Sequence, residues 1–482
     1  MGLFGILVGL GLLIFLSYRG WSILLVAPLA ALTAALAAGE PLLAHWTETF
    51  MGGAAKFLAQ FFPLFLLGAV FGKVMEDSGS VEAIANFMMA KLGTGRAVLA
   101  VVVAGAVVTY GGVSLFVALF VLAPMATSLF KLADIPRRLM PAAIALGTMT
   151  FTMSALPGTP ALQNAIPMPF FGTTPFAAPG LGIIAAAIML SFGLWWLNRA
   201  ETGARRVGEG YGKDQTVDVP AKEQAARERA TIASEFDPAE IAHGSHAETS
   251  PSALVALLPL VVVILVNLAM SLLVLPQVDT SYLADQRWGA TSLSAVAGVW
   301  AVVTALAAAI VTAIALNYRR LPSLQASLDA GANASVLPAL SVASLVGFGT
   351  VVAALPAFAL VRHWVLSIEG GPLVSLAVAT NVLAALTGSA SGGLTIALDA
   401  LGDTYLRLAA ELGIDPALLH RVAVMSAGTL DSLPHNGAVV TLLAVCGVTH
   451  RDSYVDILVV AIVGALLALA VVIALGSIFG SF

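Results

Sequence analysis

Residues 428–443, GTLDSLPHNGAVVTLL, place polar chemistry inside an apolar stretch that runs from about 417 to 447. Asp431, Pro434, His435 and Asn436 all fall within this short segment. A bilayer offers no water to a broken helix, so a break at depth needs partners from protein or from an aqueous cavity. An ionisable residue at depth costs about 3 kcal/mol or more. The stretch therefore indicates either a binding site inside a membrane protein or a segment that does not cross the membrane.

Asp431 and His435 are four residues apart, with Pro434 between them, so they need not share a helix face. Imidazole titrates near neutrality, and burial disfavours the charged form of a carboxyl group. Either side chain could load and release a proton, and we expect both to bind a coupling ion. The alternatives are an N-cap role for Asp431 and a hydrogen-bonded core role for His435.

Residues 147–165, GTMTFTMSALPGTPALQNA, resemble the first stretch. When the shared Leu-Pro pairs are aligned, residues 154–159 lie over residues 431–436, and Ser154 lies over Asp431. A matched pair of Gly/Pro-interrupted apolar segments, one in each half of a chain, is a pointer to the binding site of a transporter.

The composition predicts an all-α polytopic membrane protein. The 482 residues are 59% hydrophobic and 10% charged, with a mean hydropathy of +0.96, whereas soluble chains carry roughly 25% charged residues. The net charge of −5 and the lack of a basic patch argue against nucleic acid as a partner. One cysteine, Cys446, permits neither an internal disulfide nor a cysteine metal site. No dinucleotide fingerprint, P-loop or HExxH motif occurs, so we expect no cofactor and no enzyme.

Two apolar runs are interrupted in the middle. TYGGVS (109–114) divides the run 97–130, and TGSASGG (387–393) divides the run 373–402. The shorter arms fall below the length that spans a hydrocarbon core of about 30 Å. We interpret both runs as re-entrant hairpins, the alternative being one kinked helix each. With the other apolar runs, this predicts about ten spanning helices and two hairpins.

The two halves carry the same landmarks in the same order. Residues 132–148 lie over 412–429, and residues 172–190 lie over 448–466, at offsets of about 275–281. With the polar run 199–251 in the cytoplasm, most basic residues lie on that side and both termini lie outside. The halves then have opposite orientations, as in the inverted repeats of secondary transporters.

This interpretation divides the chain into five parts. They are N-terminal scaffold helices (1–57), a first inverted repeat (58–198, with hairpin 97–130 and broken helix 139–165), a cytoplasmic polar linker (199–251), linking scaffold helices (252–332), and a second inverted repeat (333–482, with hairpin 373–402 and broken helix 417–446).

No Lys or Arg lies centrally in an apolar run. Half-helix N-termini at the breaks would supply positive potential in their place. This favours a carboxylate held by dipoles, or a neutral polar substrate; the alternative is that the small residues only pack helices closely. The expected substrate-binding residues are small, hydroxyl, amide and imidazole residues at the breaks: Thr109, Gly111, Gly112, Ser114, Gly158, Thr159, Asn164, Thr387, Ser389, Ser391, Gly392, His435 and Asn436.

Residues 430–438 (LDSLPHNGA), residues 155–160 (ALPGTP) and the Gly/Ser-rich turn at 387–393 resemble the gluconate:proton symporter (gluconate permease) family of the ion transporter superfamily. The resemblance implies proton-coupled uptake of gluconate, a related sugar acid or another small hydroxy acid across a bacterial inner membrane. It also implies a homodimer in which a transport domain moves against a scaffold, as in an elevator mechanism. Neither hairpin turn carries the Ser-Asn-Thr of the sodium–dicarboxylate branch.

Three rival hypotheses remain at this point. One is sodium-coupled transport of citrate or a dicarboxylate. Another is an intramembrane enzyme that uses Asp431 and His435, although no nucleophile is paired with them at a known motif spacing. The third is a channel. Away from the breaks, we expect Lys73, Glu76 and Asp77 to form solvated surface at a helix end. The count of basic residues places Arg421 on the side opposite the cytoplasm.

Overall fold

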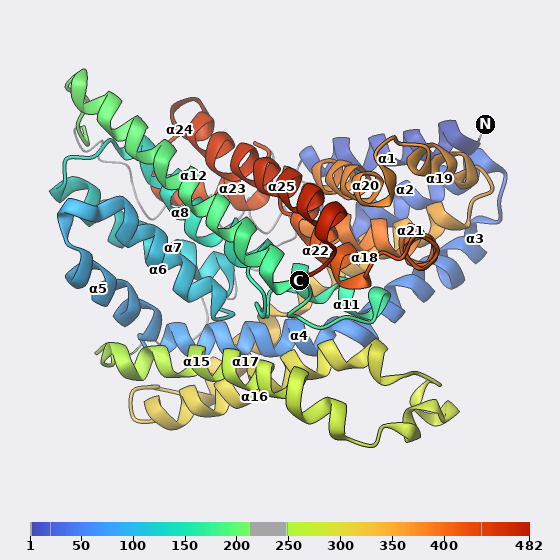
Figure 1. The fold of residues 1–482 in the computed structure, drawn as a ribbon, viewed down its shortest axis with the longest axis horizontal. Helices are drawn as coiled ribbons and strands as arrows, with labels where there is room; N and C mark the ends of the chain where they lie inside the picture. Colours follow the sequence, from blue (N-terminus) through green and yellow to red (C-terminus); the bar gives the residue numbers. More distant parts are fainter. Residues whose placement is uncertain (1, 20, 213–246, 248, 435) are drawn as a thin grey trace.

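The computed structural model describes residues 2–19, 21–212, 247, 249–434 and 436–482. Within these residues the regular structure is entirely helical, as the composition predicts (Figure 1). Most of the predicted linker, including His243 and His246, lies outside the described residues, as does His435.

Six helices in the described part of the chain are long and apolar enough to cross a membrane. They are Leu42–Asp77, Pro179–Arg206, Ala253–Gln277, Leu293–Asn317, Leu324–Ala354 and His450–Phe479. Further apolar helices are shorter, at 10–17 residues, and they include arms of both expected hairpins and both helices at the N-terminus. The chain is thus a multi-pass membrane protein, and the number of ten spans stays a prediction.

The first half combines long, short and broken helices. A continuous helix leads through α3 (Leu42–Ala44) and η1 (His45–Phe50) into α4 (Met51–Asp77). The chain continues through α5 (Ser80–Leu92), η2 (Thr94–Arg96), α6 (Ala97–Tyr110), α7 (Leu115–Leu132), η3 (Arg137–Leu139), α8 (Met140–Thr148), α9 (Phe151–Ser154), α10 (Leu162–Ala165), α11 (Pro167–Phe171) and α12 (Pro179–Arg206). Helix α12 therefore extends into the region predicted as linker.

The second half repeats this order of elements. A long bent helix comes first, then a short helix, a pair of helices, a broken helix and a final long helix. These are α17 (Leu324–Ala334) with α18 (Val336–Ala354), α19 (Phe358–Leu366), α20 (Gly371–Thr387) with α21 (Ala390–Leu412), α22 (Pro416–Ala427) with η8 (Leu430–Ser432) and α23 (Gly437–Cys446), and α24 (His450–Ile457) with η9 (Leu458–Val463) and α25 (Gly464–Phe479).

Two helix pairs flank these halves. Helices α1 (Gly2–Tyr18) and α2 (Ile23–Ala38) pack together, as do α15 (Ala253–Ala269) and α16 (Leu293–Asn317). Short turns η4 (Met270–Val274), η5 (Leu275–Gln277), η6 (Ser281–Ala284) and η7 (Gln286–Trp288) join the second pair. Helix α4 runs between α15–α17 on one side and the helices of the two broken segments on the other (Figure 1).

The breaks follow from residues that cannot continue a helix. Gly112 and Gly388 adopt φ values of +97° and +65° at the turns between the paired helices. Gly158, with φ +79°, lies between Pro157 and Pro160 in the first broken segment. The first segment also breaks earlier than the sequence predicts, at residues 149–150 between α8 and α9.

The paired helices contact each other closely. Helix α6 packs on α7, and α20 packs on α21. Gly393 lies directly against the backbone of Ala384, so a side chain at this position would collide with the opposite arm. Glycine lets the backbones of packed membrane helices approach each other this closely.

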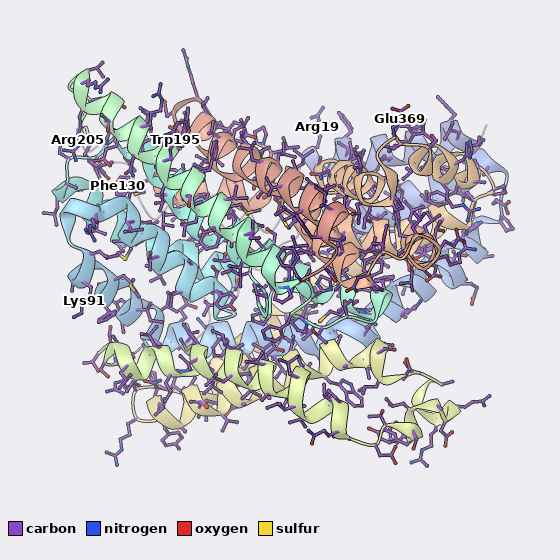
Figure 2. All side chains as sticks on the ribbon, viewed as in Figure 1. Arg19, Lys91, Phe130, Trp195, Arg205 and Glu369 are labelled. Carbon is purple, nitrogen blue, oxygen red and sulfur yellow. The ribbon has the colours of Figure 1, made fainter. Side chains whose placement is uncertain are left out.

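Charged side chains separate into two groups. Arg19, Lys91, Arg205 and Glu369 are exposed at the periphery of the molecule (Figure 2). The second group is buried at the end of α4, where Lys73 and Asp77 have no exposed surface. The expectation of solvated surface there is therefore wrong.

Candidate binding cavity

A cavity of about 250 Å³ lies where the two interhelical turns and the two broken segments meet. The turn between α6 and α7 contributes Gly112 and Ser114, and the N-terminal turn of α21 contributes Ser389 and Ser391. The broken segments contribute residues 160–163 and Asp431, Asn436 and Ala438, while α4 and the residues around the α17–α18 junction complete the lining. The cavity is therefore assembled from both halves of the chain.

Four helices of ten or more residues have an N-cap residue in the lining, and one of them, α18, continues from α17 through Ser335 in a helical conformation. The other three begin after a residue with non-helical backbone angles. Their N-cap residues are Ser114 for α7, Ser389 for α21 and Asn436 for α23, and all three line it. The first backbone N–H groups of a helix lack partners inside the helix and carry partial positive charge. Three such ends around one cavity make a favourable place for an anion.

The cap side chains explain why these residue types stand at the breaks. Ser389 Oγ accepts a hydrogen bond from the Gly392 N–H at 3.2 Å. Asn436 Oδ1 accepts from Ala438 N–H at 2.7 Å and from Val439 N–H at 3.3 Å, and its Nδ2 donates to Gly388 O at 2.7 Å. The last bond ties the second broken segment to the α20–α21 turn. Ser114 makes no side-chain cap bond.

Asp431 is the one charged side chain among the described residues that line the cavity. It lies on η8 and is half-buried, and Ser432 Oγ donates to its Oδ1 at 3.3 Å. No Lys, Arg or His belongs to the described lining. Within the described lining, positive potential therefore comes from backbone N–H groups, and Asp431 is the ionisable side chain.

The structure brings together some of the residues expected from the sequence and not others. Those that line the cavity are Thr109, Gly112, Ser114, Ser389, Ser391, Asp431 and Asn436. Those outside the lining are Gly111, Gly158, Thr159, Asn164, Thr387 and Gly392. His435 lies outside the described residues.

The residues outside the lining hold backbone in place. Asn164 Nδ2 donates to Thr159 O and to Pro175 O, each at 3.0 Å. Gly158 O accepts from Asn267 Nδ2 of α15 at 2.9 Å. Thr387 Oγ1 donates to Leu383 O at 2.8 Å, within its own helix. These residues position the walls of the cavity.

Gln163 and Ser335 line the cavity although sequence reasoning did not select them. Gln163 stands beside Asn164, and consecutive residues of a helix point in different directions, so the side chain next to the selected one reaches the cavity. The amide of Gln163 inside an apolar run was the sequence signal that could have identified it. No sequence signal marked Ser335, which lies at the α17–α18 junction.

Arg421 is fully buried, and its predicted place on the side opposite the cytoplasm stays a prediction. Its guanidinium donates to Ala177 O at 2.7 Å and 3.2 Å and to Ser154 O at 3.3 Å. The neighbouring His420 is also buried, with Nδ1 2.6 Å from Thr173 Oγ1 and Nε2 3.2 Å from Asn164 Oδ1. Helix α22 of the second half thus anchors the unwound backbone of the first.

The charges at the end of α4 are buried. Lys73 Nζ lies 3.1 Å from Asp77 Oδ1 and 3.2 Å from Glu76 Oε2. Ser327 Oγ of α17 donates to Asp77 Oδ2 at 2.6 Å. This ion pair lies within α4 and outside the cavity lining, and the Ser327 hydrogen bond joins it to α17.

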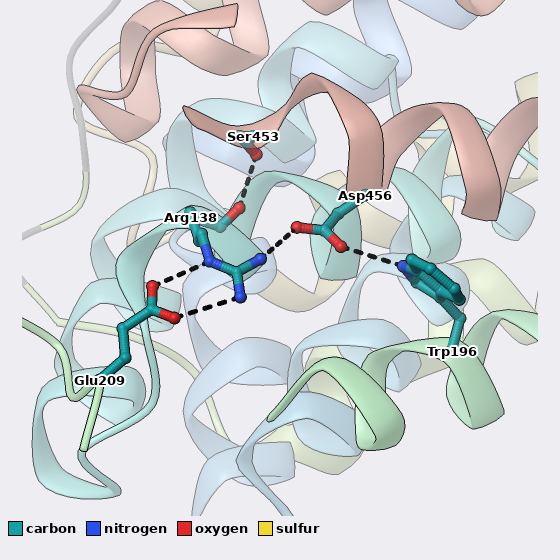
Figure 3. Close-up of polar contacts among 5 residues, drawn as sticks. All are labelled: Arg138, Trp196, Glu209, Ser453 and Asp456. Carbon is teal, nitrogen blue, oxygen red and sulfur yellow. Dashed lines mark hydrogen bonds and ion pairs between the residues drawn. The ribbon is translucent and has the colours of Figure 1, made fainter. Parts of the chain in front are cut away.

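A second polar cluster lies apart from the cavity (Figure 3). Arg138 Nε donates to Glu209 Oε1 at 2.8 Å, and its Nη1 donates to Asp456 Oδ2 at 2.7 Å. Trp196 Nε1 donates to Asp456 Oδ1 at 3.0 Å, and Ser453 Oγ donates to Arg138 O at 2.6 Å. The cluster joins η3, α12 and α24, and so connects the two halves.

Cys446, the single cysteine, is buried at the end of α23 with 1% of its surface exposed. Its backbone carbonyl accepts a hydrogen bond from Arg137 Nε at 3.0 Å. The thiol is therefore enclosed by protein.

Comparison with known proteins gives matches along the whole chain. Residues 1–170 match the model of the GntP family permeases. The uncharacterized transporter YxjC of Bacillus subtilis is 41% identical over 479 residues, which cover 98% of each chain. The high-affinity gluconate transporter of Escherichia coli is 32% identical over 165 residues, covering 33% of this chain and 36% of that protein.

Two solved structures share the fold. The YdaH transporter of Alcanivorax borkumensis superposes with a TM-score of 0.54 at 18% identity, covering 91% of this chain and 89% of that one. MtrF of Neisseria gonorrhoeae, described among antimetabolite efflux pumps, superposes with a TM-score of 0.53 at 14% identity, covering 91% and 85%. At such identities the likeness shows the fold alone.

Proposed function

Because this chain belongs to the GntP permease family and is a transporter, we propose that it is a symporter that imports a small organic acid with protons. The substrate is gluconate or another hydroxy or short-chain monocarboxylate. One observation carries the proposal: three helix N-termini and one carboxyl group, Asp431, meet at a single cavity.

The substrate carboxylate binds at the N-termini of α7, α21 and α23, where backbone N–H groups compensate its charge. Thr109, Ser114, Ser389 and Ser391 contact the substrate through their hydroxyl groups. Gly112 lets the backbone approach the ligand closely, since no side chain stands between them. The remaining expected residues, such as Asn164 and Thr387, position these groups.

Asp431 is the proposed coupling residue. An anionic substrate beside an ionised Asp431 would place two negative charges in one cavity of low polarity, which is costly. Proton binding to Asp431 removes one of them, so the substrate and the proton favour each other's binding. His435 is the second proposed proton site.

The proposal includes the movement that carries substrate across the bacterial inner membrane. The two halves are inverted repeats, and the α6–α7 and α20–α21 pairs are re-entrant hairpins. Hairpins and broken helices form a transport domain that moves as an elevator against a scaffold in a homodimer. The repeated order of elements supports this arrangement, and so does a cavity lined both by α4 and α18 and by the breaks.

Uptake into proteoliposomes under separate pH and sodium gradients tests the proposal. We expect an inward proton gradient alone to drive accumulation of a hydroxy monocarboxylate. Accumulation that needs sodium and ignores pH would instead support sodium-coupled transport of citrate or a dicarboxylate. Equilibration without accumulation under either gradient would indicate a channel.

A further inference from the structure

Helices α18 and α21 pack together through small and apolar residues. A Cβ atom added to Gly392 of α21 would lie 2.5 Å from Leu345 Cδ1, and one added to Gly349 of α18 would lie 3.2 Å from the Ile396 side chain. Helix α18 carries no ionisable side chain. A group on α21 that moves along this interface therefore meets hydrocarbon and backbone at most positions.

One hydrogen bond between side chains crosses this interface in the described part of the chain. Thr350 Oγ1 of α18 lies 2.9 Å from Asp399 Oδ2 of α21. A Cβ atom added to Gly53 of α4 would lie 2.2 Å from the same hydroxyl oxygen, so the backbone of α4 closes this junction. Asp399 is half-buried, and nine residues, about 13.5 Å of helix rise, separate it from Ala390 at the start of α21.

Asp399 and Asp431 differ from the other carboxyl groups in their surroundings. Among the described residues, every other carboxyl side chain that is not exposed lies within ion-pair distance of a basic side chain. Asp431 lines the cavity, and Asp399 does not. A half-buried carboxylate without a cation beside it is costly in an apolar surrounding, and binding a proton removes its charge.

The hydrogen atoms at the junction also favour a protonated Asp399. Thr350 Oγ1 lies 2.9 Å from Val346 O as well as from Asp399 Oδ2. A hydroxyl group carries one hydrogen, so it can donate to only one of these acceptors when Asp399 is ionised. When Asp399 is protonated, it donates to Thr350, and Thr350 donates to Val346 O. Both contacts are then hydrogen bonds.

No other charge in the described residues compensates Asp399 at this junction. The helices that pack on α21 include α10, α11, α18 and α20, which carry no ionisable side chain. On α4, α21 and α22 the ionisable side chains are exposed or have other partners, as at Lys56, Asp403, Arg407, Tyr405, His420 and Arg421.

Resting on the proposed function, we infer that α21 moves along α18 only while Asp399 is protonated. A movement of one helical turn takes the carboxyl group from Thr350 to Val346 or to Ala354, and neither side chain can donate a hydrogen bond. The ionised group would lose its described partner there, whereas the protonated group carries no charge into the apolar surrounding. The proton enters and leaves on one side of the membrane, so it controls the rate of transport and not its driving force.

Substrate exchange in proteoliposomes with equal pH on both sides tests this inference, with labelled gluconate and 3-hydroxybutyrate as probes. Asp399→Asn cannot ionise and keeps a side chain that can hydrogen-bond to Thr350, so it imitates the protonated form. We expect it to exchange substrate severalfold faster than the unmodified protein in alkaline buffer and at the same rate in acidic buffer. Damage to the fold would not produce a faster transporter. Asp403→Asn, at an exposed position one turn further along α21, should follow the unmodified protein at every pH.

Accumulation under a pH gradient separates this inference from the proposed function. Asp399→Asn should accumulate substrate as the unmodified protein does, because the Asp399 proton does not cross the membrane. Loss of accumulation would make Asp399 a coupling residue and overturn the inference, as would exchange that is unchanged or uniformly slower. Failure of the unmodified protein to transport any organic acid would overturn both.

Thr350→Val tests the hydrogen bond itself. It removes the described donor to the ionised carboxyl group and keeps a β-branched side chain at the junction. The ionised form is then less favourable, so the fall of exchange in alkaline buffer should move to higher pH. A fall at the same pH as in the unmodified protein would exclude this contact as the one that controls the movement.

Discussion

The two broken segments occupy corresponding places in the two halves, yet the surrounding protein treats them differently. In the first half, Arg421, His420, Asn164 and Asn267 hold the unwound backbone with buried hydrogen bonds. In the second half, the break carries the half-buried Asp431, whose side chain is bonded by the neighbouring Ser432.

The residue pair aligned by the shared Leu-Pro makes the difference concrete. Ser154 is buried, its hydroxyl donates to Thr150 O at 3.1 Å, and its carbonyl accepts from Arg421. Asp431 lines the cavity. Buried side chains of α22 and α15 thus hold the first break, and the second break presents a carboxyl group to the cavity.

The largest expected effect comes from removing the charge that distinguishes the second break. Asp431→Asn imitates the protonated form, so substrate exchange should continue while accumulation driven by a pH gradient disappears. One pH unit is worth about 1.4 kcal/mol per proton, a factor of about ten in accumulation. Uptake into proteoliposomes should therefore fall from about tenfold accumulation to equilibration.

Asp403→Asn is the matched control, because Asp403 is exposed on α21 and does not line the cavity. This variant should accumulate substrate as the unmodified protein does. Full gradient-driven accumulation by Asp431→Asn would remove Asp431 from the coupling mechanism and leave the two breaks chemically equivalent.

A smaller effect is expected from breaking the support of the first segment. Arg421→Met leaves the carbonyls of Ser154 and Ala177 buried without these donors, at about 1–3 kcal/mol each, although relief of a buried charge offsets part of the loss. We expect a net destabilisation of about 2–4 kcal/mol, seen as a lower melting temperature. Arg407→Met, at an exposed position on α21, should stay within about 0.5 kcal/mol.

If Arg421→Met melted like the unmodified protein, the first break would not depend on α22 for its shape. If it melted normally and lost gradient coupling instead, the division between support and chemistry would be reversed. The two readouts, melting temperature and accumulation, therefore separate the roles of the two segments.

The smallest effects concern the helix caps that face the cavity. Ser389 caps α21 through its hydroxyl, whereas Ser114 makes no cap bond. Ser389→Ala should therefore cost about 1 kcal/mol of stability. Ser114→Ala should cost less stability and weaken substrate binding a few-fold instead. Equal melting temperatures for the two variants would show that the Ser389 cap contributes nothing measurable.

The helical fold and the breaks at proline or φ-positive glycine could be predicted from the sequence, because these residues interrupt a helix by local sterics alone. The break at residues 149–150 was not predicted. Gly112, Gly388 and Pro157 are examples. The cavity was predictable in outline for a related reason, since Ser389 and Asn436 are residue types that cap helices and mark where N–H groups become free.

The positions of the other side chains depend on tertiary contacts, which no local sequence pattern predicts. Asn164 and Gln163 are adjacent amides, and only the path of a helix of four residues decides which one faces the cavity. Lys73 and Asp77 resemble a solvated helix end until α17 packs over them with Ser327. Arg421 has the charge of a surface residue, and its burial depends on carbonyls that are more than 240 residues distant in the chain.

The burial of Cys446 has a practical consequence for chemical labelling. Because the native thiol is enclosed, a membrane-impermeant maleimide should react with cysteines introduced at exposed positions and leave the native side chain unmodified. Asp285 and Arg319 are exposed near opposite ends of α16. Labelling of Asp285→Cys from outside the cell, and of Arg319→Cys only after the membrane is opened, would fix the orientation of the chain without first replacing its own cysteine.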